Sequence, residues 1–135
     1  MSTARLTNWH EALCERIAED RRRPFAWGEH DCVLWAANVV LAMTGQDLAT
    51  RYRGRYRNAL GASRLINRLG GMDAILCSVL GSPIAPLYAR AGDVGIVENA
   101  GADVIAVCVG MDWIAPTASG LGTVPFTAAR SAWRV

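Results

Sequence analysis

A long apolar segment constrains the fold of this chain more than any other feature. The segment starts at Asp31, a favourable N-cap residue, and ends at Gly45, a residue type that commonly terminates helices. Asn38 is the only strongly polar residue inside it, so a helix built from it is apolar on most faces. Such a helix must be surrounded by the rest of the domain, and we therefore expect it at the centre of the fold.

The loop that leads into this helix places a cysteine where a nucleophilic thiol would be expected. The loop reads Pro-Phe-Ala-Trp-Gly-Glu-His-Asp-Cys from Pro24 to Cys32. A cysteine in the first turn of a helix lies near the positive end of the helix dipole and near free backbone N–H groups. We expect this position to lower the pKa of Cys32 and favour the reactive thiolate, opposed by Asp31 unless its carboxylate caps the helix.

Length and composition indicate a single compact domain. The 135 residues are 52% hydrophobic and 19% charged, which is typical of a globular chain with one core. No apolar run reaches the roughly 18 residues that span a bilayer, so we expect no membrane span. Charged residues interrupt the N-terminal segment, which argues against a signal peptide and predicts synthesis in the cytoplasm.

The net charge of +2 argues against nucleic acid as a required partner. All fourteen basic residues are arginines, and they cluster at residues 21–23 and at alternate positions between 51 and 57. We interpret the clusters as a solvated helix end and a polar loop. The alternative is a patch for an anionic polymer or for an acidic protein face.

The cysteines show no metal-binding pattern. None of Cys14, Cys32, Cys77 and Cys108 forms a CxxC pair, so we expect neither a zinc nor an iron–sulfur site, and no cofactor is implied. Disulfides are not expected in a cytosolic chain. Apart from Cys32, we expect the cysteines to be small buried residues of apolar segments.

The hydrophobic pattern changes from helical to β-like after Arg90. Trp9, Leu13 and Ile17 predict a first amphipathic helix, for which Asn8 and Glu11 have the spacing of a capping box. Two further helices are expected at 62–69 and 72–80, and short strands at 93–98, 104–109, 113–115, 122–125 and 132–135. Helices followed by strands predict an α+β fold with an antiparallel sheet.

Two stretches resemble the NlpC/P60 cysteine peptidases, which cut peptidoglycan stem peptides. Pro24-Phe25-x-Trp27-Gly28 with Asp31-Cys32 is similar to the core motif of that family, and Gly92-Asp93-Val94 is similar to its Gly-Asp-hydrophobic strand. The resemblance implies one papain-like domain over residues 1–135. In it, N-terminal helices pack on a short-stranded antiparallel sheet, and Cys32 is the nucleophile.

A second resemblance covers nearly the whole chain. It is to a small family common in bacteriophages and prophages, near tail genes. The similar motifs are Trp27-Gly28-x-x-Asp31-Cys32, Thr44-Gly45-x-Asp47, Arg53-Gly54-x-Tyr56 and Leu69-Gly70-Gly71. This resemblance implies a place in the virion tail and other tail or baseplate proteins as partners, with peptidoglycan as a further candidate.

The catalytic histidine of the peptidases has no counterpart here. The strand after the Gly-Asp motif carries Asp103 instead, and a carboxylate is a poor base for a thiol because carboxyl groups ionise near pH 4. A tyrosine that often lies near the thiol is replaced by Phe25. His30 is a substitute base, although a helix N-terminus disfavours its imidazolium form; a locally packed histidine is the alternative.

The candidate site therefore consists of Cys32, with His30 and Asp103 as candidate bases. The residues expected around it are Phe25, Trp27, Gly28, Asp31 and Trp35. We expect the two tryptophans to wall the site and Gly28 to adopt a backbone conformation closed to other residues.

Two functions remain open, besides a cytosolic thiol amidase unrelated to cell walls. The first is a tail-tip or tail-assembly protein that uses the fold as a structural or docking module with a degenerate active site. It predicts an exposed apolar face, with Trp113 or Trp133 as candidates. The second is an active cysteine hydrolase that cleaves peptidoglycan stem peptides during DNA entry. It predicts an open groove at Cys32 and a histidine nitrogen within about 4 Å of the sulfur.

Overall fold

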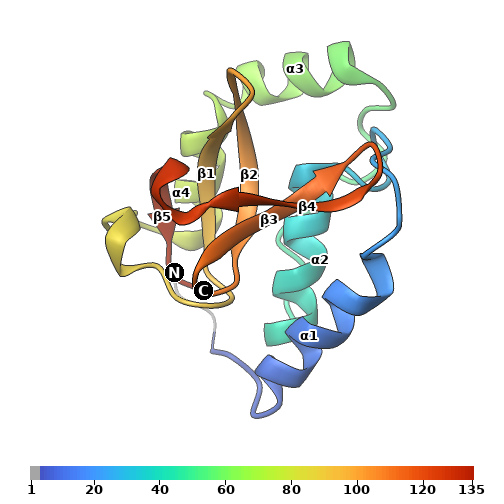
Figure 1. The fold of residues 1–135 in the computed structure, drawn as a ribbon. Helices are drawn as coiled ribbons and strands as arrows, with labels where there is room; N and C mark the ends of the chain where they lie inside the picture. Colours follow the sequence, from blue (N-terminus) through green and yellow to red (C-terminus); the bar gives the residue numbers. More distant parts are fainter. Residues whose placement is uncertain (1–3) are drawn as a thin grey trace.

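Residues 4–135 of the computed structural model form four α-helices followed by an antiparallel five-stranded sheet (Figure 1). This confirms the expected α+β order, with helices packed on the sheet; residues 1–3 of the expected domain lie outside the described part. The helices are α1 (Trp9–Asp20), α2 (Cys32–Thr44), α3 (Ala59–Arg68) and α4 (Met72–Leu80). The strands are β1 (Val94–Asn99), β2 (Ala102–Cys108), β3 (Asp112–Thr117), β4 (Gly120–Pro125) and β5 (Ala129–Trp133).

Strands β1 to β4 form a meander, and the last strand, β5, returns to pair with the free edge of β1. The spatial order of the sheet is β4-β3-β2-β1-β5, and every neighbouring pair is antiparallel. The β1–β2 hairpin turns through Ala100 and Gly101, both of which have positive φ. Its tip, with α3 nearby, borders the cavity described below (Figure 1).

Helix α2 lies at the centre of the domain, as expected. The Asp31 side chain accepts a hydrogen bond from the Leu34 N–H at its start, and Gly45 ends it with φ +80°. Trp35, Val39 and other α2 residues are fully buried against strands β1 and β2, helix α4 and Trp133. Figure 1 shows α1 running alongside α2, so the apolar helix has neighbours on several sides.

Helix α1 begins at the expected place but without the expected cap. The Asn8 side chain makes no capping hydrogen bond, so the predicted capping box is wrong. The start of the helix is held by other contacts: the Leu6 N–H bonds to the distant Met43 carbonyl, and the Arg5 guanidinium, four residues before Trp9, lies 4.2 Å from the centre of the Trp9 ring. The bond from Leu6 to Met43 spans 37 positions and is invisible to a local sequence pattern.

Both faces of the sheet are covered by core side chains. Trp133 packs in the core shared with α2 and α4, whereas Trp113 packs in a second cluster with Val97 and Val124. Both tryptophans are completely buried in the core on the two faces of the sheet, so neither can form part of an exposed apolar face, contrary to that expectation. Gly95 is required beneath Trp113, since a Cβ at this position would collide with the indole ring.

Two of the cysteines expected in the core are exposed. Cys14 and Cys77 lie at the surface, whereas Cys108 is buried as expected. Each exposed cysteine directly follows a buried leucine, Leu13 or Leu76, in an amphipathic helix. One residue further along a helix turns the side chain by about 100°, enough to move it from the inner to the outer face.

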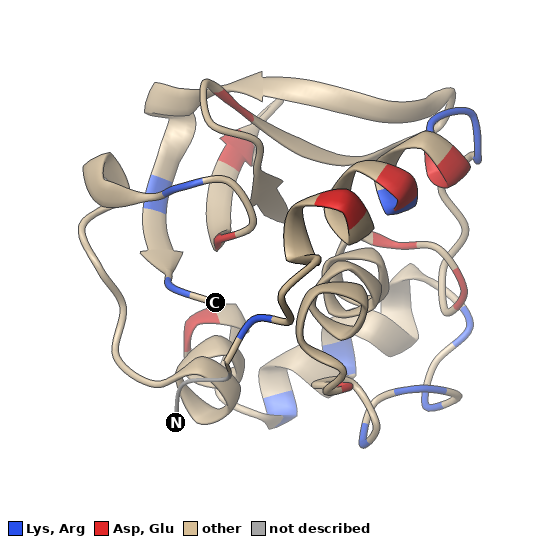
Figure 2. Cartoon of the chain, turned by 90° about the horizontal axis from the view of Figure 1, so that it is seen from below, with Lys and Arg blue, Asp and Glu red and all other residues tan. Residues whose placement is uncertain are grey.

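Charged residues are unevenly distributed over the molecule. Figure 2 shows acidic positions repeating along α1, where Glu11, Glu15 and Glu19 are exposed, and basic positions on several loops as well as on α1, α3 and β5. Within residues 4–135, no helix has both the length and the apolar character needed to cross a membrane.

Candidate active site

Cys32 lies at the N-terminus of α2 and borders a cavity of about 460 Å³. The loop before α2 forms one end of the cavity, helix α3 forms a wall, and strands β2, β3 and β4 form the opposite side. The inner surface is mostly apolar. A hollow of this size and character can accept part of a ligand or a few side chains.

The Asp31 carboxylate holds the start of α2 and the preceding loop together. Its Oδ1 accepts the Leu34 N–H at 2.9 Å, and its Oδ2 accepts the Gly28 N–H at 3.0 Å and the Tyr56 hydroxyl at 2.6 Å. Asp31 is fully buried. The carboxylate is therefore engaged in capping α2 and in joining the loop around Gly28 to the segment around Tyr56.

Gly28 meets the expectation of a glycine-only conformation. Its φ is +79°, and a Cβ at this position would collide with the Tyr56 carbonyl oxygen. The turn is closed by paired backbone hydrogen bonds between Ala26 and His30. The loop before Cys32 is thus fixed both by its own turn and by contact with the segment around Tyr56.

The three aromatic residues expected around the site have different positions. Phe25 and Trp27 both line the cavity and make an edge-to-face contact with ring centres 4.7 Å apart. Trp35 points elsewhere: it is buried in the core, and its Nε1–H donates to Asp20 at 3.0 Å. Trp35 therefore anchors α1 to α2, and the aromatic wall of the cavity consists of Phe25 and Trp27 with Tyr56.

The thiol of Cys32 is not activated, contrary to the sequence-based expectation. The residue is only 8% exposed, and burial raises the pKa of the Cys32 thiol to about 11. The backbone N–H groups of Ile105 and Val33 favour the thiolate but do not offset burial, while the nearby Asp31 adds to the increase in pKa. At pH 7 such a thiol is ionised in about one molecule in ten thousand.

His30 is packed into the protein instead of lining the cavity. It is completely buried and is not among the cavity-lining residues. Neither imidazole nitrogen makes a hydrogen bond with any described residue, Cys32 included. Burial and the charge of Arg23 lower the pKa of His30, and Asp20 opposes this shift. The structure therefore holds His30 as a neutral ring between α1 and α2.

Asp103 does line the cavity, on the side formed by β2. Its carboxylate is paired with the Arg130 guanidinium, which also binds Asp73 at 2.8 Å. The two carboxylates raise the pKa of Arg130, with Asp73 contributing first. Asp103 is thus placed at the same cavity as Cys32 but is held in an ion pair.

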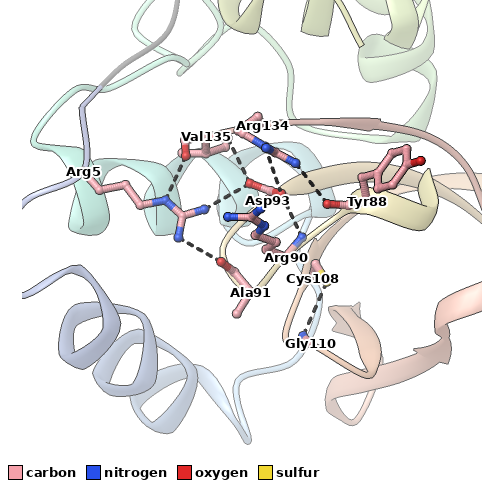
Figure 3. A network of polar contacts seen from close by, with 9 residues as sticks. All are labelled: Arg5, Tyr88, Arg90, Ala91, Asp93, Cys108, Gly110, Arg134 and Val135. Carbon is pink, nitrogen blue, oxygen red and sulfur yellow. Dashed lines mark hydrogen bonds and ion pairs between the residues drawn. The ribbon is translucent and has the colours of Figure 1, made fainter. Parts of the chain in front are cut away.

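The Gly-Asp motif forms a structural junction at the opposite end of β1 (Figure 3). Buried Asp93 accepts hydrogen bonds from the Arg5 guanidinium and from the backbone N–H groups of Arg90 and Val135. Arg5 also donates to the carbonyl oxygens of Ala91 and Val135. Asp93 therefore joins the segments around Arg5 and Val135 to the start of β1. It does not line the cavity beside Cys32.

Tyr56 is the site residue that sequence reasoning missed. The sequence places it in an arginine-rich polar loop, yet it is buried, lines the cavity and donates a hydrogen bond to Asp31. Burial and the hydrogen bond to Asp31 raise the pKa of the Tyr56 hydroxyl. The Arg53-Gly54-x-Tyr56 motif was the available signal, but nothing local shows that this loop folds back onto Gly28.

The chemistry available at the cavity is limited. Within residues 4–135, no three His, Cys, Asp or Glu side chains come together as a metal site would require. The cavity presents a protonated thiol, an ion-paired carboxylate and aromatic side chains. Such a set can bind an apolar group, and as arranged it lacks a free base that could activate Cys32.

Comparison with curated proteins finds none that matches this chain. One family does match, over residues 4–135, and its description is "Domain of unknown function (DUF6950)". Because the match covers almost the whole chain, the chain belongs to the DUF6950 family.

Proposed function

We propose that this chain is a phage or prophage tail-tip or tail-assembly protein. Its fold is of the papain-like NlpC/P60 type, and it serves as a structural or docking module with a degenerate active site. Two observations support the proposal: the sequence motifs resemble a family found near phage tail genes, and the thiol of Cys32 is buried without a base. The tail assignment rests on the resemblance, and the loss of catalysis rests on the geometry around Cys32.

The observation that carries the non-catalytic role is the burial of Cys32 without a base. A cysteine nucleophile needs a lowered thiol pKa or an adjacent base. Here the pKa of the thiol is raised to about 11, and the imidazole nitrogens of His30 make no hydrogen bond to it. The carboxylate of Asp103 is engaged by Arg130.

The loop geometry around Cys32 is nevertheless retained. Asp31, Gly28 and Tyr56 hold the loop rigidly beside an open hollow, although no nucleophile is being activated there. A mostly apolar hollow is a suitable shape for receiving a segment of another protein. We infer that docking is the property for which this loop is suited.

The test is genetic and uses the phage or prophage that encodes the chain. Deleting the gene is expected to stop tail assembly, whereas Cys32→Ala is expected to give intact, infectious particles that contain the protein by mass spectrometry. Cys108→Ala is the matched control, because Cys108 is also a buried cysteine but does not line the cavity.

A Cys32→Ala phage that assembles normal tails but fails to infect would contradict the proposal. That result would favour the active cysteine hydrolase that cleaves peptidoglycan stem peptides. Absence of the protein from purified particles, together with normal tails after deletion, would contradict the tail assignment itself.

A further inference from the structure

Helix α3 is packed less tightly than the other helices of the described chain. Ala62 is its one buried residue, whereas α4, which has nearly the same length, buries Ile75, Leu76 and Leu80. No α3 residue belongs to a core cluster of residues 4–135, while α1, α2 and α4 all contribute to the main core. Figure 1 shows α3 at the edge of the domain. A segment with so few buried apolar contacts opens at a low cost in free energy.

The inner face of α3 borders the cavity beside Cys32 instead of a packed core. Five α3 residues line the cavity, and their spacing of three and four positions places them along one face of the helix. These residues are Ala59, Ala62, Ser63, Ile66 and Asn67. The face that anchors an ordinary amphipathic helix therefore lies against a hollow of about 460 Å³.

Polar contacts do not attach α3 to the sheet or to the other helices either. Every hydrogen bond seen for residues 58–70 in the described chain stays inside the segment 58–71, including the cap that Asn58 provides. Arg64 and Arg68 take part in no ion pair with a described residue. The helix is therefore held by its two ends and by the packing of its first turn.

The two ends of α3 are attached in different ways. Before the helix, Tyr56 is fixed by its hydrogen bond to Asp31. A Cβ at Gly61 would lie 3.1 Å from the Tyr56 Cβ, so the first turn packs closely on this fixed residue. After the helix, Gly70 and Gly71 have φ of +95° and +101°, and nothing lies within 4 Å of a Cβ at Gly71. A glycine pair of this kind allows the backbone to change direction.

We propose that α3 is a lid, which swings away from strands β2, β3 and β4 and opens the cavity beside Cys32. The pivot is the first turn of α3 against Tyr56, and Gly70 with Gly71 takes up the change in backbone direction. The remaining walls stay in place, because the strands belong to the sheet and Asp31 fixes the loop before α2. The position of α3 then sets how large a group the cavity can admit. This device goes beyond the tail assignment and does not depend on it.

Hydrogen–deuterium exchange of the full chain, followed by mass spectrometry, tests the lid. A helix of ten residues is marginal on its own, so its amides exchange whenever α3 leaves the wall. The internal control is α4, which has nine residues and packs in the core. After correction for intrinsic exchange rates, we expect α3 to exchange on the order of 100-fold faster than α4. Comparable protection of the two helices would overturn the proposal.

Low concentrations of urea separate local opening of α3 from unfolding of the whole domain. Opening of the lid exposes little new surface, so the exchange of α3 is expected to be nearly independent of urea. Exchange of the central helix α2 is expected to accelerate, because it requires the core to open. Exchange of α3 that accelerates in parallel with that of α2 would show that only global unfolding releases α3, and would overturn the lid.

Paired substitutions on the inner face of α3 test where the lid closes. Ser63→Leu with Asn67→Leu adds apolar side chains at exposed positions that line the cavity, and these should hold α3 against the opposite wall. Ser63→Ala with Asn67→Ala is the matched control, because alanine and leucine both favour helix but alanine fills little of the cavity.

We expect α3 to exchange roughly tenfold more slowly in the leucine variant than in the alanine variant, with the exchange of α4 unchanged. Both variants alter exposed positions, and circular dichroism would confirm that each is folded. Equal exchange of α3 in the two folded variants would show that its inner face does not close onto the opposite wall, and would overturn the proposal.

Discussion

Changing Tyr56 to phenylalanine removes one hydrogen bond from the most connected carboxylate near the cavity. The Tyr56 hydroxyl donates to Asp31 Oδ2 at 2.6 Å, and both residues are buried. A hydrogen bond to a charged group contributes about 1.5–3 kcal/mol, and the phenyl ring that remains leaves no large void. Asp31 keeps the N–H groups of Gly28 and Leu34, so we expect the free energy of unfolding to fall by about 2 kcal/mol.

Urea denaturation followed by tryptophan fluorescence measures this change in the free energy of unfolding. The matched control is Tyr88→Phe, because Tyr88 is 66% exposed and no hydrogen bond of its hydroxyl is seen within residues 4–135. We expect a change of less than about 0.5 kcal/mol for the control. Equal effects of the two substitutions would show that the Tyr56–Asp31 bond does not hold the loop.

Two further predictions concern the same loop. Gly28→Ala is expected to destabilise the fold more than Gly54→Ala. Both glycines have φ near +80°, but only a Cβ at position 28 would collide with the Tyr56 backbone. Equal losses of unfolding free energy in urea denaturation would contradict this steric argument. Burial lowers the pKa of His30, so below about pH 6.5 the unfolded chain binds more protons than the folded one. The stability that neutral His30 contributes is present above that pH and is lost as pH falls toward the lowered pKa. His30→Leu is therefore expected to flatten the decrease in stability as the pH falls below about 6.5, and parallel curves for variant and wild type would contradict it.

The parts of the fold that were predictable have strong local signals. Helix α2 combines an N-cap aspartate, a continuous apolar run and a terminal glycine, and its ends and its burial match the prediction. Gly28 was predictable because a tight loop between a proline and a helix needs a positive φ. The change to β-rich residues after Arg90 located all five strands to within a few residues.

The remaining features depend on which segments meet in space. The start of a helix can be recognised in the sequence, and its dipole predicts a lowered pKa for Cys32. The sequence does not show that a strand covers the thiol, and this burial raises the pKa by more than the helix N-terminus lowers it. The same holds for Tyr56, whose hydroxyl reaches Asp31 across 25 positions of sequence. Trp113 is buried because Phe126 and the second core cluster cover it, a contact that no periodicity predicts.

The central claim, that Cys32 is not an activated nucleophile, is most directly tested by the pH dependence of its alkylation. Native protein would be treated briefly with iodoacetamide, and labelling of each cysteine would be measured by peptide mass spectrometry. Exposed Cys14 and Cys77 serve as internal references for labelling of accessible thiols. A thiol pKa of about 11 predicts that Cys32 reacts on the order of 300-fold more slowly near pH 7 than a free cysteine, whose pKa is about 8.5. Labelling of Cys32 that is faster than that of Cys14 below about pH 8 would contradict the account and identify an active thiolate.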